Sequence, residues 1–360
     1  MRAFWFCSLV CFAFLNFTPL HAQSTAAELN EAGWKMLQQG EPARATPLFA
    51  KALVLRPDEP VLLFGAGVAA HLDGRSSDAK TKLQRALEVN PRFTSASLLL
   101  GEIVYSEGDV DRAITIYKAA LSFAPTDRDL NGRLREWSRE SNVHGGFVER
   151  QQGRFNVMFE GRTDAALAAR ATQVLGAAFS RIAGQIRVSP SDPIAVILYT
   201  DKQFRDITRA PAWSSGLYDG RIRIPVGGAA RTPSLFDVVL VHELTHAMVV
   251  SIAAKGVPTW LHEGLAQHFS GADAEAARRR LAAGGTFISF EDLEQSFAGF
   301  SGDDAATAYD QSLVAVHVLA QRPNLNWGQL LYALSEARTP SEAFRSFGIT
   351  YAELDAEFKR

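Results

Sequence analysis

The segment His242-Glu243-Leu244-Thr245-His246 decides how the second half of the chain is interpreted. It lies in an apolar stretch with clear helix limits, because Thr232 suits an N-cap, Pro233 suits the first helical position, and Gly256 and Pro258 follow the far end. The stretch is apolar on nearly every face, which predicts a helix inside a domain. Polar side chains within such a helix require a reason, since burying them is unfavourable unless they are paired.

The spacing of the two histidines supplies that reason. His242 and His246 are one helical turn apart, so both imidazoles project from the same face and can bind one zinc ion. Glu243 lies about 100° further round the helix and can reach a water on such an ion without being a ligand.

A catalytic zinc ion usually takes three protein ligands and leaves one position for water. The histidine that metzincins use is absent, because Val249 and Ile252 stand where that pattern requires glycine and histidine. A carboxylate candidate, Glu263, occurs 17 residues after His246 in the segment Trp260-Leu261-His262-Glu263-Gly264-Leu265-Ala266. The short turn between the two segments predicts that their helices pack as a hairpin.

Together these motifs resemble the gluzincin clan of zinc peptidases, particularly its bacterial peptidase MA-like members, over roughly residues 150–360. The resemblance implies that His242, His246 and Glu263 bind one Zn²⁺ ion and that Glu243 is the general base. The ion would lower the pKa of its water and polarise the scissile carbonyl, while Glu243 moves the proton to the leaving amine.

The same resemblance makes Tyr309 a candidate donor to the oxyanion, because family members commonly carry a tyrosine ahead of an apolar helix such as Leu313 to Leu319. A tyrosine that simply packs at a helix start is the alternative. His262 and His268 flank Glu263 off its helical face, so we expect surface positions or positions beside the ligands. His317 reads as an ordinary helical histidine.

The residues before the central motif predict a mixed α/β domain that begins near residue 153. Strands are expected at 155–159 and 194–199, and helices at 164–186 and around Phe204. Arg221-Ile222-Arg223-Ile224-Pro225 alternates like a strand with one covered face, and its proline suits an edge or a strand end. Such an edge could pair with the backbone of a substrate.

A 34-residue period runs through the first third of the chain. Pro57, Pro91 and Pro125 keep this step. The other positions in register are Gly33, Gly67 and Gly101; Gly40, Gly74 and Gly108; Ala45, Ala79 and Ala113; Ala52, Ala86 and Ala120; and Phe49, Leu83 and Tyr117. The pattern resembles three tetratricopeptide repeats over residues 26–127, followed by a linker or capping region at 128–152. This resemblance implies a groove that binds a protein partner.

The first 22 residues read as a secretory signal peptide, with Arg2, an apolar run to Leu15 and a small residue at Ala22. Both cysteines, Cys7 and Cys11, lie in it, so a metal in the mature chain must be held by histidine and carboxylate. No later stretch is expected to span a membrane, and a periplasmic or secreted protein is predicted. With 37 basic and 39 acidic residues, we expect no general attraction to nucleic acid.

The expected architecture is an N-terminal all-α solenoid of tetratricopeptide repeats followed by an α+β zincin-like domain of the gluzincin type. The leading functional interpretation is an exported zinc metallopeptidase acting on peptides or proteins. An endopeptidase is preferred, because the Gly-x-Met-Glu-Asn segment of the clan's aminopeptidases is absent. The alternative is a repeat-based scaffold protein whose zinc domain is structural or degenerate; retention of Glu243 favours the enzyme.

Overall fold

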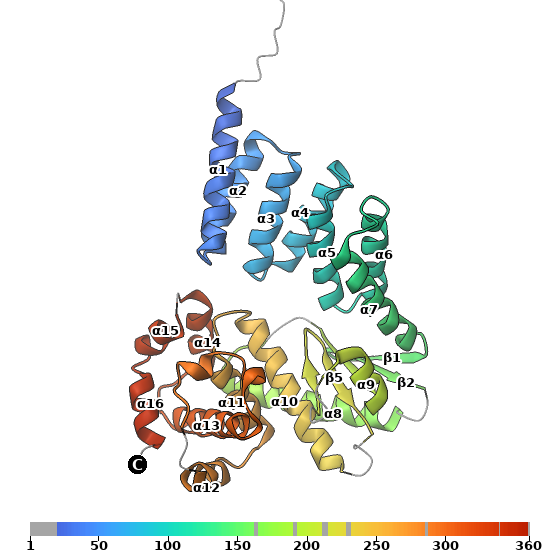
Figure 1. Cartoon of the computed structure of the whole chain (residues 1–360). Coiled ribbons are helices and arrows are strands. Elements are labelled where there is room, and N and C mark those ends of the chain that lie inside the picture. The colour runs from blue at the N-terminus through green and yellow to red at the C-terminus, as the bar shows by residue number, and fades with distance from the viewer. Residues whose placement is uncertain are drawn as a thin grey trace, which may run out of the picture. The chain divides into compact units, whose positions relative to one another are not determined.

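A computed structural model of the chain describes residues 20–161, 165–189, 193–210, 215–227, 232–284, 287–337 and 339–358. The predicted signal segment therefore lies almost entirely outside the described residues. The chain divides into two compact units, residues 1–100 and 101–360, and the division falls inside helix α5 (Thr94–Ser106). Figure 1 labels the helices and strands along the chain.

The first unit consists of paired helices. These are α1 (Leu20–Gln38), α2 (Pro42–Leu55), α3 (Pro60–Leu72), α4 (Ser76–Val89) and the first part of α5. A Cβ added to Gly33 would lie 2.8 Å from the ring of Phe49, and one added to Gly67 would lie 2.9 Å from Leu83. The glycine of one helix therefore packs against the large side chain of the next helix, as the 34-residue period predicts.

The third helix pair repeats this packing in the second unit. It is formed by α5 and α6 (Val110–Leu121), and a Cβ on Gly101 would lie 2.2 Å from the ring of Tyr117. Gly40, Gly74 and Gly108 all have positive φ, which explains why glycine recurs in the turn of each helix pair. The helical repeats expected from the sequence are thus present in the structure.

The segment expected as a linker or cap contains helix α7 (Arg128–His144) and strand β1 (Phe147–Gln152). Strand β1 pairs along its length with β2 (Phe155–Glu160), so it belongs to the sheet. The sequence did not predict this strand because its side chains are almost all exposed and show no apolar alternation.

The sheet has the order β1-β2-β3-β5-β4, where β3 is Ile194–Tyr199, β4 is Leu217–Tyr218 and β5 is Ile222–Pro225. Strands β2, β3 and β5 run parallel, and β1 and β4 are antiparallel to their neighbours. Helices α8 (Ala165–Ile186) and α10 (Pro233–Ile252) pack against one face, and α7 and α9 (Asp201–Thr208) pack near the other.

One of the expected positions for the proline of β5 is found, and one expectation for the strand is wrong. Pro225 is the last residue of β5, and the strand is not at the edge of the sheet, because β4 pairs with it on the outer side. The expectation of one covered face is wrong, because both faces are covered: Ile222 and Ile224 enter the main core, while Arg221 and Arg223 on the opposite side are each 1% exposed. Helices α5 and α7 bring polar partners to these arginines, which sequence alternation cannot reveal.

The remaining helices follow α10 and complete the core. They are α11 (Thr259–Ser270), α12 (Ala274–Gly284), α13 (Gly302–Ala320), α14 (Trp327–Glu336), α15 (Pro340–Ser346) and α16 (Tyr351–Phe358), with short 3-10 turns at Asp292–Glu294 and Phe297–Gly299. Helices α10 and α11 pack against each other, as the hairpin prediction requires.

The expectation that no segment after the signal peptide could span a membrane is wrong for helix α10. With 20 residues and a mean hydropathy of 1.6, it is long and apolar enough to cross a membrane, although no such stretch was expected after the signal segment. Its interior contacts are with α8, α11 and the sheet, and buried core helices pass the same test of length and composition.

Candidate metal centre and catalytic site

Helix α10 presents His242, Glu243 and His246 in the interior of the second unit. The Nε2 atoms of the two histidines lie 3.1 Å apart, and their ring centroids are 4.8 Å apart. Burial lowers the pKa of His246 to about 3, which keeps this imidazole neutral. A neutral imidazole is the form of histidine that binds metal ions.

Helix α11 brings Glu263 to these histidines. Its Oε2 atom lies 3.5 Å from Nε2 of His242 and 3.7 Å from Nε2 of His246. The next residue, Gly264, allows this approach, since a Cβ there would lie 2.3 Å from the backbone oxygen of Ser312 on α13. The Oε2 atom is buried and has no hydrogen-bond partner among the described residues.

The three candidate ligand atoms match the size of a zinc site. Their separations are 3.1, 3.5 and 3.7 Å, and two atoms bound tetrahedrally at about 2.0–2.1 Å from one ion are about 3.3 Å apart. The structure describes one group of three such residues close enough to hold an ion, and it is His242, His246 and Glu263. Two imidazoles and a carboxylate form a known catalytic zinc ligand set, so these residues fit the ion.

Glu243 lies beside this group and is not part of it. It is 6% exposed, and burial raises the pKa of its carboxyl to about 7, a shift that His242 opposes and Glu263 reinforces. The carboxylate lies against the start of strand β4, because a Cβ on Gly216 would be 2.7 Å from Oε1 of Glu243. A carboxyl with a pKa near neutrality is suited to general acid–base chemistry.

Tyr309 is placed in the second turn of α13, whereas the sequence predicted a position just before an apolar helix. Burial raises the pKa of its hydroxyl, and the carboxylates of Glu263 and Glu243 raise it further. Its ring packs edge-on against Phe297, with centroids 5.5 Å apart. Tyr309 therefore lies in the electrostatic environment of the candidate site, and its proposed chemical role stays a prediction.

His262 directly contacts a candidate ligand. Its Nδ1 atom lies 2.6 Å from Nδ1 of His246, and the two rings stack with centroids 4.7 Å apart. This agrees with the expected position beside the candidate ligands. His268 lies instead near His317, with ring centroids 6.5 Å apart.

Sequence reasoning missed a buried charge cluster on the other face of the sheet. It consists of Arg221, which precedes β5, Arg223 of β5, Glu140 of α7, Tyr105 of α5, and Tyr199 of β3. The one signal in the sequence was the alternation of arginine and isoleucine, which is equally typical of a strand with a solvated face.

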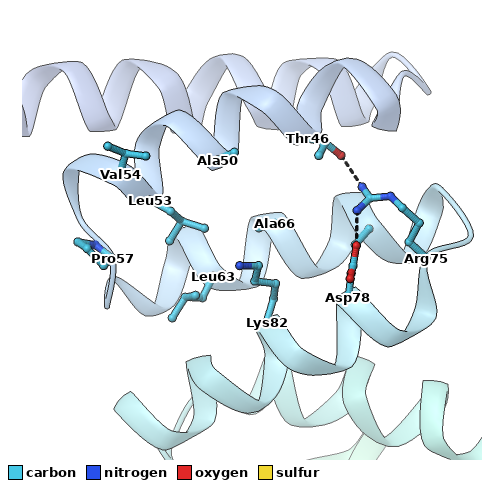
Figure 2. A pocket seen from close by; sticks show the side chains of 11 residues that line it. Thr46, Ala50, Leu53, Val54, Pro57, Leu63, Ala66, Arg75, Asp78 and Lys82 are labelled. Carbon is cyan, nitrogen blue, oxygen red and sulfur yellow. Dashed lines mark hydrogen bonds and ion pairs between the residues drawn. The ribbon is translucent and has the colours of Figure 1, made fainter.

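In the first unit, an apolar hollow of about 390 Å³ lies between α2, α3 and α4, with a polar end where Arg75 donates hydrogen bonds to Thr46 and Asp78. Figure 2 shows the side chains that line this hollow. Its lining includes the small and aliphatic side chains of Ala50, Leu53, Val54, Leu63, Ala66 and Ala70.

Comparisons with known proteins match the repeats. Residues 73–128 match the tetratricopeptide repeat family. The chain is 28% identical over 105 residues to BBSome complex member BBS4 of Mus musculus, covering 29% of this chain and 20% of that protein. It is 25% identical over 109 residues to small glutamine-rich tetratricopeptide repeat-containing protein 2 of Mycosarcoma maydis, covering 30% of this chain and 31% of that protein. The chain thus spans between a fifth and a third of the length of these curated relatives.

Solved structures of tetratricopeptide repeat domains are similar to part of the chain. The first repeat domain of Spaghetti (RPAP3), bound to an HSP90 peptide, is 23% identical with a TM-score of 0.32, covering 33% of this chain and 94% of that one. The Sgt2 repeat domain from Aspergillus fumigatus is 19% identical with a TM-score of 0.33, covering 36% and 86%.

The second unit matches a different family. Residues 174–360, which are more than half of the chain, match the peptidase MA superfamily. The matched region contains helices α10 and α11 and therefore all of His242, Glu243, His246 and Glu263. The chain belongs to the peptidase MA superfamily.

Proposed function

We propose that the protein is a zinc-dependent peptidase in which His242, His246 and Glu263 hold one Zn²⁺ ion. The observation that carries this proposal is the convergence of two imidazole nitrogens and one buried carboxylate oxygen within 3.7 Å of one another. A zinc ion in this position would acidify a bound water and polarise a peptide carbonyl.

In this proposal the protein's own groups hold and move protons. Glu243 accepts a proton on its carboxylate from the attacking water and returns it to the leaving amine. Its raised pKa supports both steps, because a carboxyl group that titrates near neutrality is populated in both its protonated and its deprotonated form at that pH. The Tyr309 hydroxyl, which burial keeps protonated, is proposed as the hydrogen-bond donor to the oxygen that becomes negative.

The finer functional assignments are also proposals. The absence of an aminopeptidase-type Gly-x-Met-Glu-Asn segment supports an endopeptidase. The N-terminal apolar run supports export and a periplasmic or secreted location. The repeat unit, with the apolar hollow of Figure 2, is proposed to bind a protein substrate or partner.

The decisive experiment measures bound zinc and peptide hydrolysis together in four proteins. We expect Glu243→Gln to keep the metal and lose turnover, and Glu263→Ala to lose both. His268→Gln is the matched control, because it alters a histidine on the same helix as Glu263 but outside the three-residue group. Wild-type protein that binds zinc without hydrolysing any peptide in a diverse library would instead support the scaffold alternative, and full activity in Glu243→Gln would refute the mechanism.

A further inference from the structure

We propose that the third repeat and helix α7 contribute to the function of the peptidase domain: Tyr105 and Glu140 position the β4–β5 hairpin, and Gly216, the residue just before this hairpin, lies against Glu243. Both are positioning residues, since they act through the hairpin and touch no reacting atom. The inference rests on the proposed role of Glu243, and its own test includes a measurement that needs no activity.

Glu140 of α7 is the centre of the connection. Its Oε1 atom lies 3.0 Å from Nη1 of Arg221 and 2.9 Å from Nη1 of Arg223. All three side chains are no more than 2% exposed. Two buried guanidinium groups thus share one carboxylate, and this holds β5 against α7 with little freedom to shift.

Tyr105 of α5 adds the contribution of the repeat. Its hydroxyl donates to Oε2 of Glu140 at 2.5 Å and accepts from Nη2 of Arg223 at 3.0 Å. Its ring lies under the Arg221 guanidinium, with the carbon of that group 4.2 Å from the ring centroid. A single side chain of the third repeat therefore touches both arginines and their shared carboxylate.

The cluster continues into the turn of the hairpin. Arg223 donates through Nε to both carboxylate oxygens of Asp219, at 3.0 and 2.9 Å. The next turn residue, Gly220, has a φ of +97° and lies against the end of α5, where an added Cβ would be 3.3 Å from the backbone oxygen of Ser106. The turn is therefore held by the same helix that supplies Tyr105.

The far end of the hairpin reaches the candidate catalytic site. Gly216 precedes β4, and a Cβ there would lie 2.7 Å from Oε1 of Glu243 and 2.8 Å from Cγ1 of Val239. The backbone at Gly216 thus packs directly against the Glu243 carboxylate and limits where this carboxylate can lie. A hairpin displaced towards α10 would push this carboxylate, and one displaced away would leave it room to turn.

A simpler explanation is that the cluster only stabilises the domain. Buried ion pairs often stabilise a fold no more than apolar residues of the same volume would, so stability alone gives little reason for this arrangement. The geometry favours a role in positioning the hairpin. Arg223 of the cluster binds Asp219 in the hairpin turn, and Gly216 at the opposite end of the hairpin lies against Glu243.

The test compares Tyr105→Phe with Tyr117→Phe in the full-length protein. Each substitution removes one tyrosine hydroxyl from the third repeat, but the Tyr117 hydroxyl donates to Glu102 of the same repeat, at 3.4 Å. For Tyr105→Phe we expect about tenfold faster amide exchange in residues 215–225 and a kcat lower by about three- to tenfold with KM unchanged. The control should show neither change.

A second variant probes the other end of the hairpin. Gly216→Ala should lower kcat in the same way while leaving the exchange of the turn at residues 219–221 unchanged. Equal exchange in Tyr105→Phe and Tyr117→Phe would overturn the inference, as would faster exchange in Tyr105→Phe with a wild-type kcat. If the wild-type protein hydrolyses no peptide, the proposed function fails, and the exchange comparison alone then decides whether Tyr105 holds the hairpin.

Discussion

Glu140→Gln should be among the most destabilising single substitutions in the second unit. The change keeps the size of the side chain and removes its charge. Arg221 then loses the one carboxylate that pairs with it among the described residues, and Arg223 keeps only Asp219, whose side chain is 37% exposed. Arg221 already has two buried nitrogens, Nε and Nη2, without a hydrogen-bond partner in the described structure, so it has no alternative to Glu140.

The magnitude follows from this geometry. Breaking a buried pair and leaving a charge uncompensated costs about 3–5 kcal/mol. The matched control is Glu102→Gln, which breaks an exposed pair with Arg133 between α5 and α7, where the two side chains are 39% and 52% exposed. Exposed ion pairs contribute less than about 1 kcal/mol to stability, so the free energy of unfolding of the control should be close to that of the wild type.

Urea unfolding followed by tryptophan fluorescence measures the difference. Trp137 lies on the same helix as Glu140 and stacks on Tyr105 with ring centroids 4.7 Å apart, so it reports on this region. A destabilisation by Glu140→Gln of less than about 1 kcal/mol, equal to that of the control, would show that water solvates the arginines and that the described cluster does not hold them.

Three further predictions concern the metal, pH and packing. Zinc at 100 times its dissociation constant should stabilise the wild type by about 2.7 kcal/mol in thermal unfolding and should leave Glu263→Gln unchanged; an equal shift in both proteins would place the ion elsewhere. Burial lowers the pKa of His144 to about 4, so folding keeps it neutral while the unfolded chain takes up a proton below about pH 6.5. The contribution of His144 to stability should therefore be constant above that pH and fall by about 3 kcal/mol between pH 6.5 and 4, so urea unfolding of His144→Gln should show a shallower loss than the wild type over this window. Finally, Gly264→Ala places a Cβ 2.3 Å from the backbone oxygen of Ser312, so it should destabilise the protein by about 1–3 kcal/mol or more and weaken zinc binding through Glu263. A zinc affinity equal to wild type in this variant would mean that α11 does not set the position of Glu263.

Several features of the fold could be predicted because they depend on local sequence. The glycines at 33, 67 and 101 and the large residues at 49, 83 and 117 meet in the same way in each helix pair, since both belong to one repeat and need no distant partner. The limits of α10 at Pro233 and its pairing with α11 likewise follow from proline, glycine and a short turn. Strand β1 and the two-residue strand β4 could not be predicted. The sequence of β1 is too polar, and that of β4 too short, to be distinguished from a loop by its hydrophobic pattern.

The candidate site likewise has a part that local sequence determines and a part that depends on tertiary packing. Within one helix, the sequence by itself determined that His242 and His246 share a face and that Glu243 lies beside them, because helical geometry relates residues one and four positions apart. Only the tertiary structure decided that Glu263 approaches to 3.5 Å, that His262 contacts His246, and that Arg221 and Arg223 are buried against Glu140. These contacts join segments 16 to 83 residues apart in the chain, and their distances depend on how helices and sheet pack, which no local pattern encodes.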